Sequence, residues 1–194
     1  MKRLFDITVS LIALILLCPL LLLVSLMIFV DDGSPVIFKQ SRVGKDNQLF
    51  NIYKFRTMKR DTVNVSSAEL ETPDACITKT GRFLRKSSLD ELPQLVNILK
   101  GDMSFVGPRP LIPEESEIRE LRAKYNVYSV RPGMTGLAQI NGRDTISDEE
   151  KAAYDKQYVE SRSFFGDIGI IIRTALIVVS GKDIVEGKND ATKK

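Results

Sequence analysis

Histidine is absent from all 194 residues, and cysteine occurs only twice. The lack of histidine excludes a Ser-His-Asp hydrolase, a phosphohistidine enzyme and an ordinary zinc site with histidine ligands. The two cysteines, Cys18 and Cys76, lie far apart in unlike surroundings, so we expect no disulfide framework and a reducing compartment. Chemistry in this chain must therefore rest on carboxylates, lysines, arginines, hydroxyl groups or a hard metal ion.

The charges are distributed unevenly, although the formal net charge is only +3. Residues 39–60 and 79–100 are rich in lysine and arginine, whereas residues 114–120 are acidic. Two interpretations of the basic stretches stay open: a surface that faces anionic lipid headgroups, or cations that converge on a phosphate group. Nucleic acid is not expected as a partner, because no helix-turn-helix, zinc or RNA-binding signature accompanies the charge.

The longest apolar run, residues 11–30, is long enough to cross a bilayer, because about 20 helical residues span its roughly 30 Å hydrocarbon core. Pro19 lies near the centre of this run. Inside a helix, a proline removes one backbone donor and clashes with the carbonyl four residues earlier, here that of Ile15. We expect a kink or a break between Leu14 and Pro19, which gives either a kinked spanning helix or a re-entrant helix-break-helix.

Basic residues flank the apolar run on both sides, with Lys2 and Arg3 before it and the basic stretch from Lys39 to Arg60 after it. Because such segments stay in the cytoplasm, this pattern favours the re-entrant form with both ends on the cytoplasmic face. A signal peptide fits poorly, since the run exceeds the usual core of roughly 7–15 residues and no small-x-small site precedes Asp31. We expect a membrane anchor over residues 1–32, one cytoplasmic, membrane-associated domain over 33–185 and a polar tail over 186–194.

The predicted fold class is α+β and mainly helical, with the re-entrant anchor, interfacial amphipathic helices and a small β-hairpin. The hairpin joins β-prone runs at 36–38 and 49–55 through a turn at 44–47, and residues 61–73 read as a loop. Helices are expected over 81–99, with an interruption at Pro93 and a stop at Gly101, and over 168–179. The last of these is too short to span a membrane and is either core or interfacial. A helix over 114–126 is expected to carry Ile118, Leu121 and Tyr125 on one apolar stripe. Another is expected from Ser147 onward, with Ser147 and Glu150 as its capping box.

Two adjacent carboxylates, Asp90 and Glu91, stand in the segment Ser88-Leu89-Asp90-Glu91-Leu92-Pro93-Gln94. They point about 100° apart in a helix, so each can serve a different atom of a reacting group. From these residues alone a structural interpretation is favoured, because Ser88 and Glu91 have the spacing of a capping box and Asp90 is a second candidate cap. Either arrangement places the carboxylates at a helix start, where a phosphate group also binds well.

Arginines stand beside prolines and glycines in the following segments. Arg109 lies between Pro108 and Pro110, so a stiff backbone presents its guanidinium as an oxyanion clamp requires. The segments 131–136 and 141–144 add two further arginines, and their glycines allow the backbone to approach a ligand. No segment matches a Walker loop.

At this level of detail the chain resembles the bacterial sugar transferases, specifically the small monotopic phosphoglycosyl transferases, from Lys2 to about Gly181. The motifs that carry the resemblance are Lys2-Arg3-x-x-Asp6, the Pro19 break, Tyr53-Lys54-Phe55-Arg56-Thr57-Met58, Thr80-Gly81-Arg82-Phe83-Leu84-Arg85, Ser88 to Gln94, Lys100 to Pro110, Arg131 to Gly136, Asn141-Gly142-Arg143 and Asp155-x-x-Tyr158-Val159-Glu160.

The resemblance implies transfer of a sugar 1-phosphate from a nucleoside diphosphate sugar, usually UDP-linked, to a polyprenol phosphate such as undecaprenyl phosphate, with release of UMP. It implies that Asp90 is the nucleophile, forms a phosphoryl-aspartate and also contacts Mg²⁺, while Glu91 deprotonates or positions the acceptor. By the same match, Arg109 holds phosphate, and further phosphate or nucleotide contacts are expected from Lys54, Arg56, Arg131 and Arg143. Such an enzyme works at the inner membrane, in the first membrane step of glycoconjugate assembly.

The chain departs from the family at two points. Cys18 stands where many members have a serine before the breaking proline, which removes a hydroxyl hydrogen bond to the broken turn. The extra N-terminal membrane helices of larger relatives are also missing, so we expect the minimal catalytic form. Two alternatives remain open, a non-catalytic membrane-anchored phosphate-binding protein and a Mg²⁺-dependent phosphohydrolase. Membrane lipids and a second copy of the chain are further partners that the sequence allows.

Overall fold

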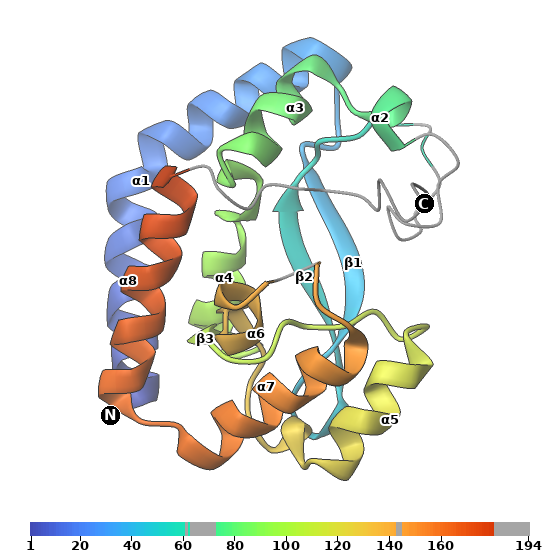
Figure 1. Ribbon diagram of the computed structural model, residues 1–194. Helices are drawn as coiled ribbons and strands as arrows, with labels where there is room; N and C mark the ends of the chain where they lie inside the picture. Colours follow the sequence, from blue (N-terminus) through green and yellow to red (C-terminus); the bar gives the residue numbers. More distant parts are fainter. Residues whose placement is uncertain (61, 63–72, 143–144, 181–194) are drawn as a thin grey trace.

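A computed structural model describes residues 1–60, 62, 73–142 and 145–180 (Figure 1). The α+β, mainly helical fold predicted from the sequence is confirmed. Its helices are α1 (Lys2–Asp32), α2 (Pro73–Cys76), α3 (Lys79–Lys86), α4 (Gln94–Lys100), α5 (Ser116–Lys124), α6 (Leu137–Ile140), α7 (Asp148–Ser161) and α8 (Phe164–Ser180). The strands are β1 (Ile37–Val43), β2 (Leu49–Phe55), β3 (Ser104–Val106) and β4 (Gly133–Thr135). The predicted tail, 186–194, and most of the predicted loop, 61–73, lie outside the described residues.

Helix α1 is one continuous helix of 31 residues that contains Pro19. Figure 1 shows that it turns partway along its length. Of the two expected effects of the proline, a kink or a break, the structure therefore shows the kink. A single missing backbone donor bends a helix without ending it when the flanking residues are apolar helix formers, as they are here.

The N-terminal end of α1 is tied to the remainder of the protein by Lys2. Its ammonium group donates to the Asp167 carboxylate, to the carbonyl of Val106 at 3.0 Å and to the Tyr158 hydroxyl at 3.2 Å. Burial and the neighbouring Asp167 carboxylate both raise the pKa of Tyr158, so its hydroxyl stays protonated at neutral pH. These bonds attach the beginning of α1 to β3, α7 and α8.

The C-terminal end of α1 is attached to the same domain. The buried Arg56 guanidinium lies 3.1 Å from the Asp32 carboxylate and also donates to the carbonyls of Asp32, Gly33 and Pro35. The helix is about 46 Å long at 1.5 Å per residue, yet both of its ends contact one domain.

One face of α1 also contributes to the hydrophobic core. Val24 and Ile28 are buried against Phe55 of β2 and Leu84 of α3. A second cluster, against which Leu14 and Leu17 pack, consists of Ile52, Leu95, Ile98 and Met103. The third cluster unites β3 with α6, α7 and α8 through Val106, Ile140, Tyr158 and Ile170. Each fully buried aliphatic side chain contributes about 1.5–3 kcal/mol, so α1 is an integral part of the fold.

The opposite face of α1 is apolar and exposed. The helix is long and apolar enough to cross a membrane, and only 11% of its most apolar window is buried. Helix α8 runs beside the first half of α1, where the rings of Phe5 and Phe164 lie 5.5 Å apart (Figure 1). It buries only Asp167 and Ile170 and exposes Phe165, Ile172, Leu176 and Val179. This exposure favours the interfacial interpretation of α8 over the core interpretation.

The predicted hairpin is confirmed, and its first strand is longer than the run at 36–38. Strands β1 and β2 pair antiparallel from Ile37 opposite Phe55 to Val43 opposite Leu49. The turn follows Gly44 and places Asp46 and Asn47 at positive φ, a conformation that these two residue types tolerate best after glycine. The short parallel pair β3–β4 was not predicted, since three-residue strands leave too little periodicity to detect.

The helix expected over 81–99 is divided earlier than predicted. Helix α3 ends at Lys86, and Ser88 adopts a left-handed conformation with φ of 55°. A short 3-10 turn, η3 (Leu89–Glu91), precedes α4. The interruption therefore begins at Ser87, six residues before Pro93, whereas the stop at Gly101 is confirmed by its φ of 98°.

Two further helices test the sequence patterns in detail. Ser147 and Glu150 form the predicted capping box at the start of α7. Ile118 of α5 is buried as expected, but Tyr125, which directly follows this helix, is 37% exposed, and Arg122 is buried. The apolar stripe predicted for this helix is thus only partly correct, because an ion pair allows a charged residue to take the inward position.

Candidate active site

Asp90 and Glu91 lie in the turn η3, which is held by the apolar residue beside them. Leu89 packs against the cluster of Val24, Ile28, Phe55 and Leu84, so the turn rests on the core. Ser88 makes no side-chain capping bond, and Pro93, not Asp90, directly precedes α4. The capping interpretation of these carboxylates is therefore wrong.

Glu91 lies between two cations that come from distant segments. Lys54 Nζ lies 2.9 Å from Glu91 Oε1, and Arg109 Nη1 lies 3.8 Å from the same oxygen. The side chains of Lys54 and Glu91 are only 20% and 14% exposed, so solvent screens this pair weakly. Lys54 extends from β2, Glu91 from η3 and Arg109 from the segment after β3. The structure thus brings three of the predicted site residues together beside Asp90.

Asn97 joins α4 to β2, and sequence analysis did not single it out. Its side chain is fully buried, donates to the Asn51 carbonyl at 2.7 Å and accepts from the Tyr53 backbone at 2.9 Å. Both partners lie on β2, next to Lys54. Asn97 therefore sets the register between α4 and β2 that allows Lys54 to reach Glu91. Its only signal in the sequence was a polar residue between the apolar pairs Leu95-Val96 and Ile98-Leu99.

The backbone around Arg109 is held by three hydrogen bonds, one at each consecutive carbonyl. The Pro108 carbonyl accepts from the Gly133 amide at 2.9 Å, the Arg109 carbonyl from Arg122 Nη1 at 2.7 Å, and the Pro110 carbonyl from Arg42 Nη1 at 3.2 Å. The prolines stiffen this segment, as the sequence predicted. Its orientation is set by β4, α5 and β1.

Arg122 and Asp155 form an almost fully buried ion pair behind Arg109. Arg122 Nη2 of α5 lies 2.5 Å from Asp155 Oδ2 of α7, and the two side chains are 4% and 1% exposed. Burial raises the pKa of the Asp155 carboxyl, and the charge and hydrogen bond of Arg122 oppose this rise. Because Arg122 also bonds the Arg109 carbonyl, the pair links two helices to the phosphate-binding candidate.

The glycines of the segment 131–136 serve a different purpose from the one expected. A Cβ at Gly133 would lie 2.1 Å from the Gly107 nitrogen, and one at Gly136 would lie 2.2 Å from the Gly107 oxygen. These positions therefore admit another stretch of backbone, and the expectation that they admit a ligand is not supported. The close approach is what allows β4 to hold the Pro108–Pro110 segment.

The other predicted contacts lie at different places. Arg56 is 7% exposed and its guanidinium is engaged at the end of α1, as described above. Arg131 is exposed, and its Nε donates to the Gly101 carbonyl at 2.7 Å. Arg143 lies outside the described residues. Of the predicted phosphate contacts, Lys54 and Arg109 therefore lie at the turn η3 with Asp90 and Glu91, which we call the acidic turn. Arg56 instead binds Asp32 at the end of α1.

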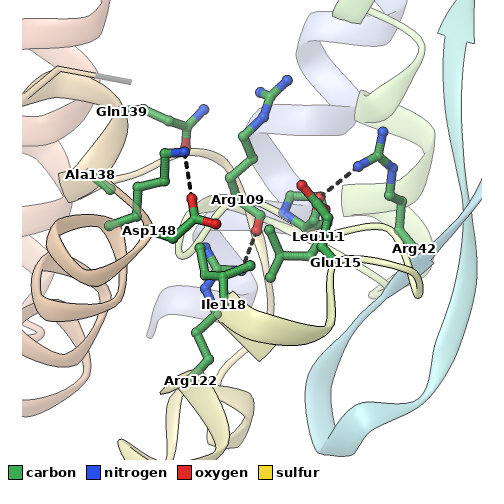
Figure 2. Close-up of a pocket in the computed structure, with 11 residues that line it drawn as sticks. Arg42, Arg109, Leu111, Glu115, Ile118, Arg122, Ala138, Gln139 and Asp148 are labelled. Atoms are coloured by element: carbon green, nitrogen blue, oxygen red, sulfur yellow. Dashed lines mark hydrogen bonds and ion pairs between the residues drawn. The ribbon is translucent and has the colours of Figure 1, made fainter. Parts of the chain in front are cut away.

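A cavity of about 90 Å³ opens beside Arg109. Figure 2 shows Arg109 in the middle of this cavity, with Gln139 on one side and Arg42 on the other. Lys151 also lines it and bonds Asp148 at 2.9 Å. Arg109 thus lines the cavity and also approaches Glu91. The cavity therefore lies next to the acidic turn.

The profile of the family Bacterial sugar transferase matches residues 1–181. The chain belongs to this family. It is 44% identical over 187 residues to an uncharacterised sugar transferase, EpsL, of Bacillus subtilis, which covers 95% of this chain and 90% of that protein. It is 41% identical over 189 residues to the exopolysaccharide production protein ExoY of Rhizobium meliloti, covering 89% and 83%. It is also 40% identical over 194 residues to an undecaprenyl-phosphate galactose phosphotransferase of Salmonella typhimurium, covering 92% of this chain and 40% of that protein.

The carboxylates of the turn η3 can supply part of the coordination of a Mg²⁺ ion. Among the described parts of the chain, no three aspartate, glutamate or cysteine side chains lie together as metal ligands. Mg²⁺ is commonly held by one or two carboxylates together with substrate phosphates, and Asp90 and Glu91 supply hard oxygen donors of that kind. The residues therefore suit an ion that is shared with a bound diphosphate.

Proposed function

We propose that this transferase moves a sugar 1-phosphate from a nucleoside diphosphate sugar, with UDP as the nucleotide, to undecaprenyl phosphate. The name of the Salmonella relative supports the acceptor and the class of reaction. The observation that carries the proposal is the convergence of Lys54, Glu91 and Arg109 beside Asp90. A carboxylate next to a cationic group is the arrangement that phosphoryl transfer to a carboxylate needs.

In the first step, a carboxylate oxygen of Asp90 attacks the sugar-bearing phosphorus. A bond forms between that oxygen and phosphorus, the bond from phosphorus to the bridging oxygen breaks, and UMP leaves with the electron pair. Arg109 binds a non-bridging phosphate oxygen, and Lys54 neutralises the charge of Glu91 next to the reacting group. Mg²⁺ held by Asp90 and the diphosphate would supply further charge neutralisation.

In the second step, an oxygen of undecaprenyl phosphate attacks the phosphorus of the phosphoryl-aspartate. The new bond gives an undecaprenyl diphosphate sugar, and the Asp90 carboxylate is released. Glu91 accepts a proton from the acceptor phosphate or orients it, a role suited to a carboxylate that two cations already hold in place. This chemistry fits the first membrane step of polysaccharide or glycoconjugate assembly.

The phosphate of the acceptor lies at the level of the lipid headgroups. An anchor that holds the catalytic domain at the membrane surface would bring the acidic turn to that level. We propose that α1 is re-entrant in the inner membrane, with both ends and the catalytic domain on the cytoplasmic face. The attachment of both ends of α1 to one domain supports this topology. The exposed apolar faces of α1 and α8 support contact with lipid.

Incubation of the full-length protein with UDP-sugars and Mg²⁺ tests the function. UMP release is measured with and without undecaprenyl phosphate, in detergent micelles. We expect sustained release of UMP only when the acceptor is present, together with an undecaprenyl diphosphate sugar in the lipid fraction. Lack of acceptor-dependent UMP from every sugar donor would refute the proposal. Release of inorganic phosphate would favour a phosphohydrolase, and binding without turnover would favour a phosphate-binding protein.

Cysteine labelling tests the topology. One cysteine is added ahead of Met1 and a second replaces the exposed Ser34, in a chain whose Cys18 and Cys76 are changed to serine. In spheroplasts, an impermeant maleimide should label neither position, because both lie on the cytoplasmic face. After lysis, both should react, which serves as the control for accessibility. Labelling of either position before lysis would refute the cytoplasmic hairpin, and labelling of only one of the two would show that α1 crosses the membrane.

A further inference from the structure

Three arginines, one lysine and two carboxylate residues line the cavity beside Arg109: Arg42, Arg109, Arg122, Lys151, Glu115 and Asp148. Arg42 lies on β1 and Arg109 on the loop after β3, and both line the same space (Figure 2). Burial, and secondarily the positive charge of Arg109, lowers the pKa of the Arg42 guanidinium to about 10. The group therefore remains protonated at neutral pH although its surroundings disfavour the charge. The carboxylates of Glu115, Glu91 and Glu114 partly offset this effect. An anion bound between Arg42 and Arg109 would offset it further.

Arg42 also has hydrogen-bonding capacity that the protein leaves unused. Its Nη1 donates to the Pro110 carbonyl at 3.2 Å and its Nη2 to Gln40 Oε1 at 2.6 Å. Its Nε is buried and has no hydrogen-bond partner. Gln139, on the far side of Arg109 in the same cavity, likewise has a buried Oε1 without a partner. Unpaired buried polar atoms are rare in native proteins, and Arg122 Nε of the same cavity is a third. The two arginine Nε groups are donors that an anion could accept from, whereas Gln139 Oε1 is an acceptor.

The position of this cavity relates it to the reaction. Arg109 approaches Glu91 on one side, 3.8 Å away, and lines the cavity on the other. A diphosphate that Arg109 contacts would therefore extend from the acidic turn into the cavity. The phosphate that Asp90 attacks would lie at the turn, and the adjoining phosphate would lie between Arg109 and Arg42.

We propose that the cavity binds the nucleoside monophosphate end of the sugar donor and that Arg42 contacts its phosphate. The inference rests on the proposed function, since it places the nucleotide half of the proposed sugar donor in this cavity. When the bond between the two phosphates breaks, the electron pair passes to the oxygen of the leaving nucleotide. Arg42 and Arg109 would stabilise the charge that develops there, so Arg42 would act on the first step and in product binding.

Binding of UMP to the full-length protein in detergent micelles tests this inference, since it requires no acceptor and no turnover. Calorimetry compares the wild type with Arg42→Gln, Arg42→Lys and the control Lys39→Gln. The control removes one positive charge from the exposed face of the same strand. Arg42→Gln should weaken UMP binding by about 10- to 100-fold, as expected for a charge-assisted hydrogen bond. Arg42→Lys should retain part of the affinity, and Lys39→Gln should bind like the wild type.

Uridine and inorganic phosphate serve as further probes. Uridine binding should not change in Arg42→Gln, because it carries no phosphate, whereas binding of inorganic phosphate should weaken. UMP binding of wild-type strength in Arg42→Gln would overturn the inference. Equal losses in Arg42→Gln and Arg42→Lys would also overturn it, because they would show that Arg42 acts only by holding the Pro110 carbonyl. Thermal unfolding of each variant identifies losses caused by misfolding, and Arg42→Lys then decides the question.

The outcomes separate this inference from the proposed function. If the protein shows no acceptor-dependent UMP release but binds UMP through Arg42, the transferase mechanism fails and the binding site stands. If transfer proceeds normally and Arg42→Gln binds UMP as the wild type does, the mechanism stands and the binding site fails.

Discussion

Replacement of Asp90 by asparagine should slow acceptor-dependent UMP release by at least about 10³-fold, the scale on which enzymes lose activity when their nucleophile is removed. Asparagine preserves the shape of the side chain in the turn η3 and removes the charged oxygen that attacks phosphorus. Intact mass after incubation with the donor alone should show an added sugar phosphate on the wild type and none on Asp90→Asn. An adduct that survives the substitution would show that another residue is the nucleophile.

Two further variants locate the effect at Asp90. Asp46→Asn removes one carboxylate from the exposed hairpin turn, at a left-handed position that asparagine also tolerates, so its activity should equal that of the wild type. Glu91→Gln should still form the adduct but should lose turnover by roughly 10²- to 10⁴-fold, as expected for a residue that acts on the acceptor. Loss of the adduct in Glu91→Gln would instead place Glu91 in the first step.

Removal of the carboxylate of Asp155 should destabilise the folded protein by about 3–5 kcal/mol, since Asp155→Ala leaves the buried Arg122 guanidinium without its partner. The free energy of unfolding is measured by denaturant titration of the full-length protein in micelles. Activity should fall as well, because Arg122 then loses the position from which it bonds the Arg109 carbonyl. Unfolding at the wild-type denaturant concentration would contradict this assignment.

Paired substitutions separate the contribution to stability from the contribution to positioning. Asp155→Asn keeps an acceptor for Arg122 and removes a charge whose burial is unfavourable, so its loss of stability should be smaller than that of Asp155→Ala. The double variant Arg122→Met with Asp155→Leu should recover most of the stability, because apolar residues can replace a buried ion pair. It should not recover activity, since the hydrogen bond to the Arg109 carbonyl is absent. Full activity in the double variant would show that this bond does not position Arg109.

Local features of the fold were predictable because neighbouring residues determine them. The capping box of Ser147 and Glu150, the stop at Gly101 and the hairpin turn after Gly44 each depend on a few consecutive residues. The kink at Pro19 also follows from the residue itself. The same reasoning failed at Ser88, which has a left-handed backbone conformation. Serine rarely adopts this conformation, so the sequence gives no sign of it.

The candidate site was predictable in part. Asp90, Glu91 and Arg109 stand in motifs that differ from ordinary helix or turn composition, and they lie where chemistry is expected. Arg56 and Arg131 stand in equally basic motifs, yet the structure gives their guanidinium groups backbone carbonyls as partners. An arginine that binds phosphate and one that holds a helix end have the same local sequence requirements, so only their surroundings distinguish them.

By itself, the sequence determined the apolar anchor, the mainly helical fold, membership in the sugar transferase family and the acidic pair that we propose as catalytic. These depend on hydrophobic periodicity, turn chemistry and consecutive motifs, all of which are local. Only the tertiary structure decided that Lys54 and Arg109 meet at Glu91, that Arg122 and Asp155 hold Arg109 from behind, and that Arg42 enters the same cavity. These contacts join residues that lie on different helices, strands and loops. Their geometry follows from how these elements pack, which no short segment of sequence specifies.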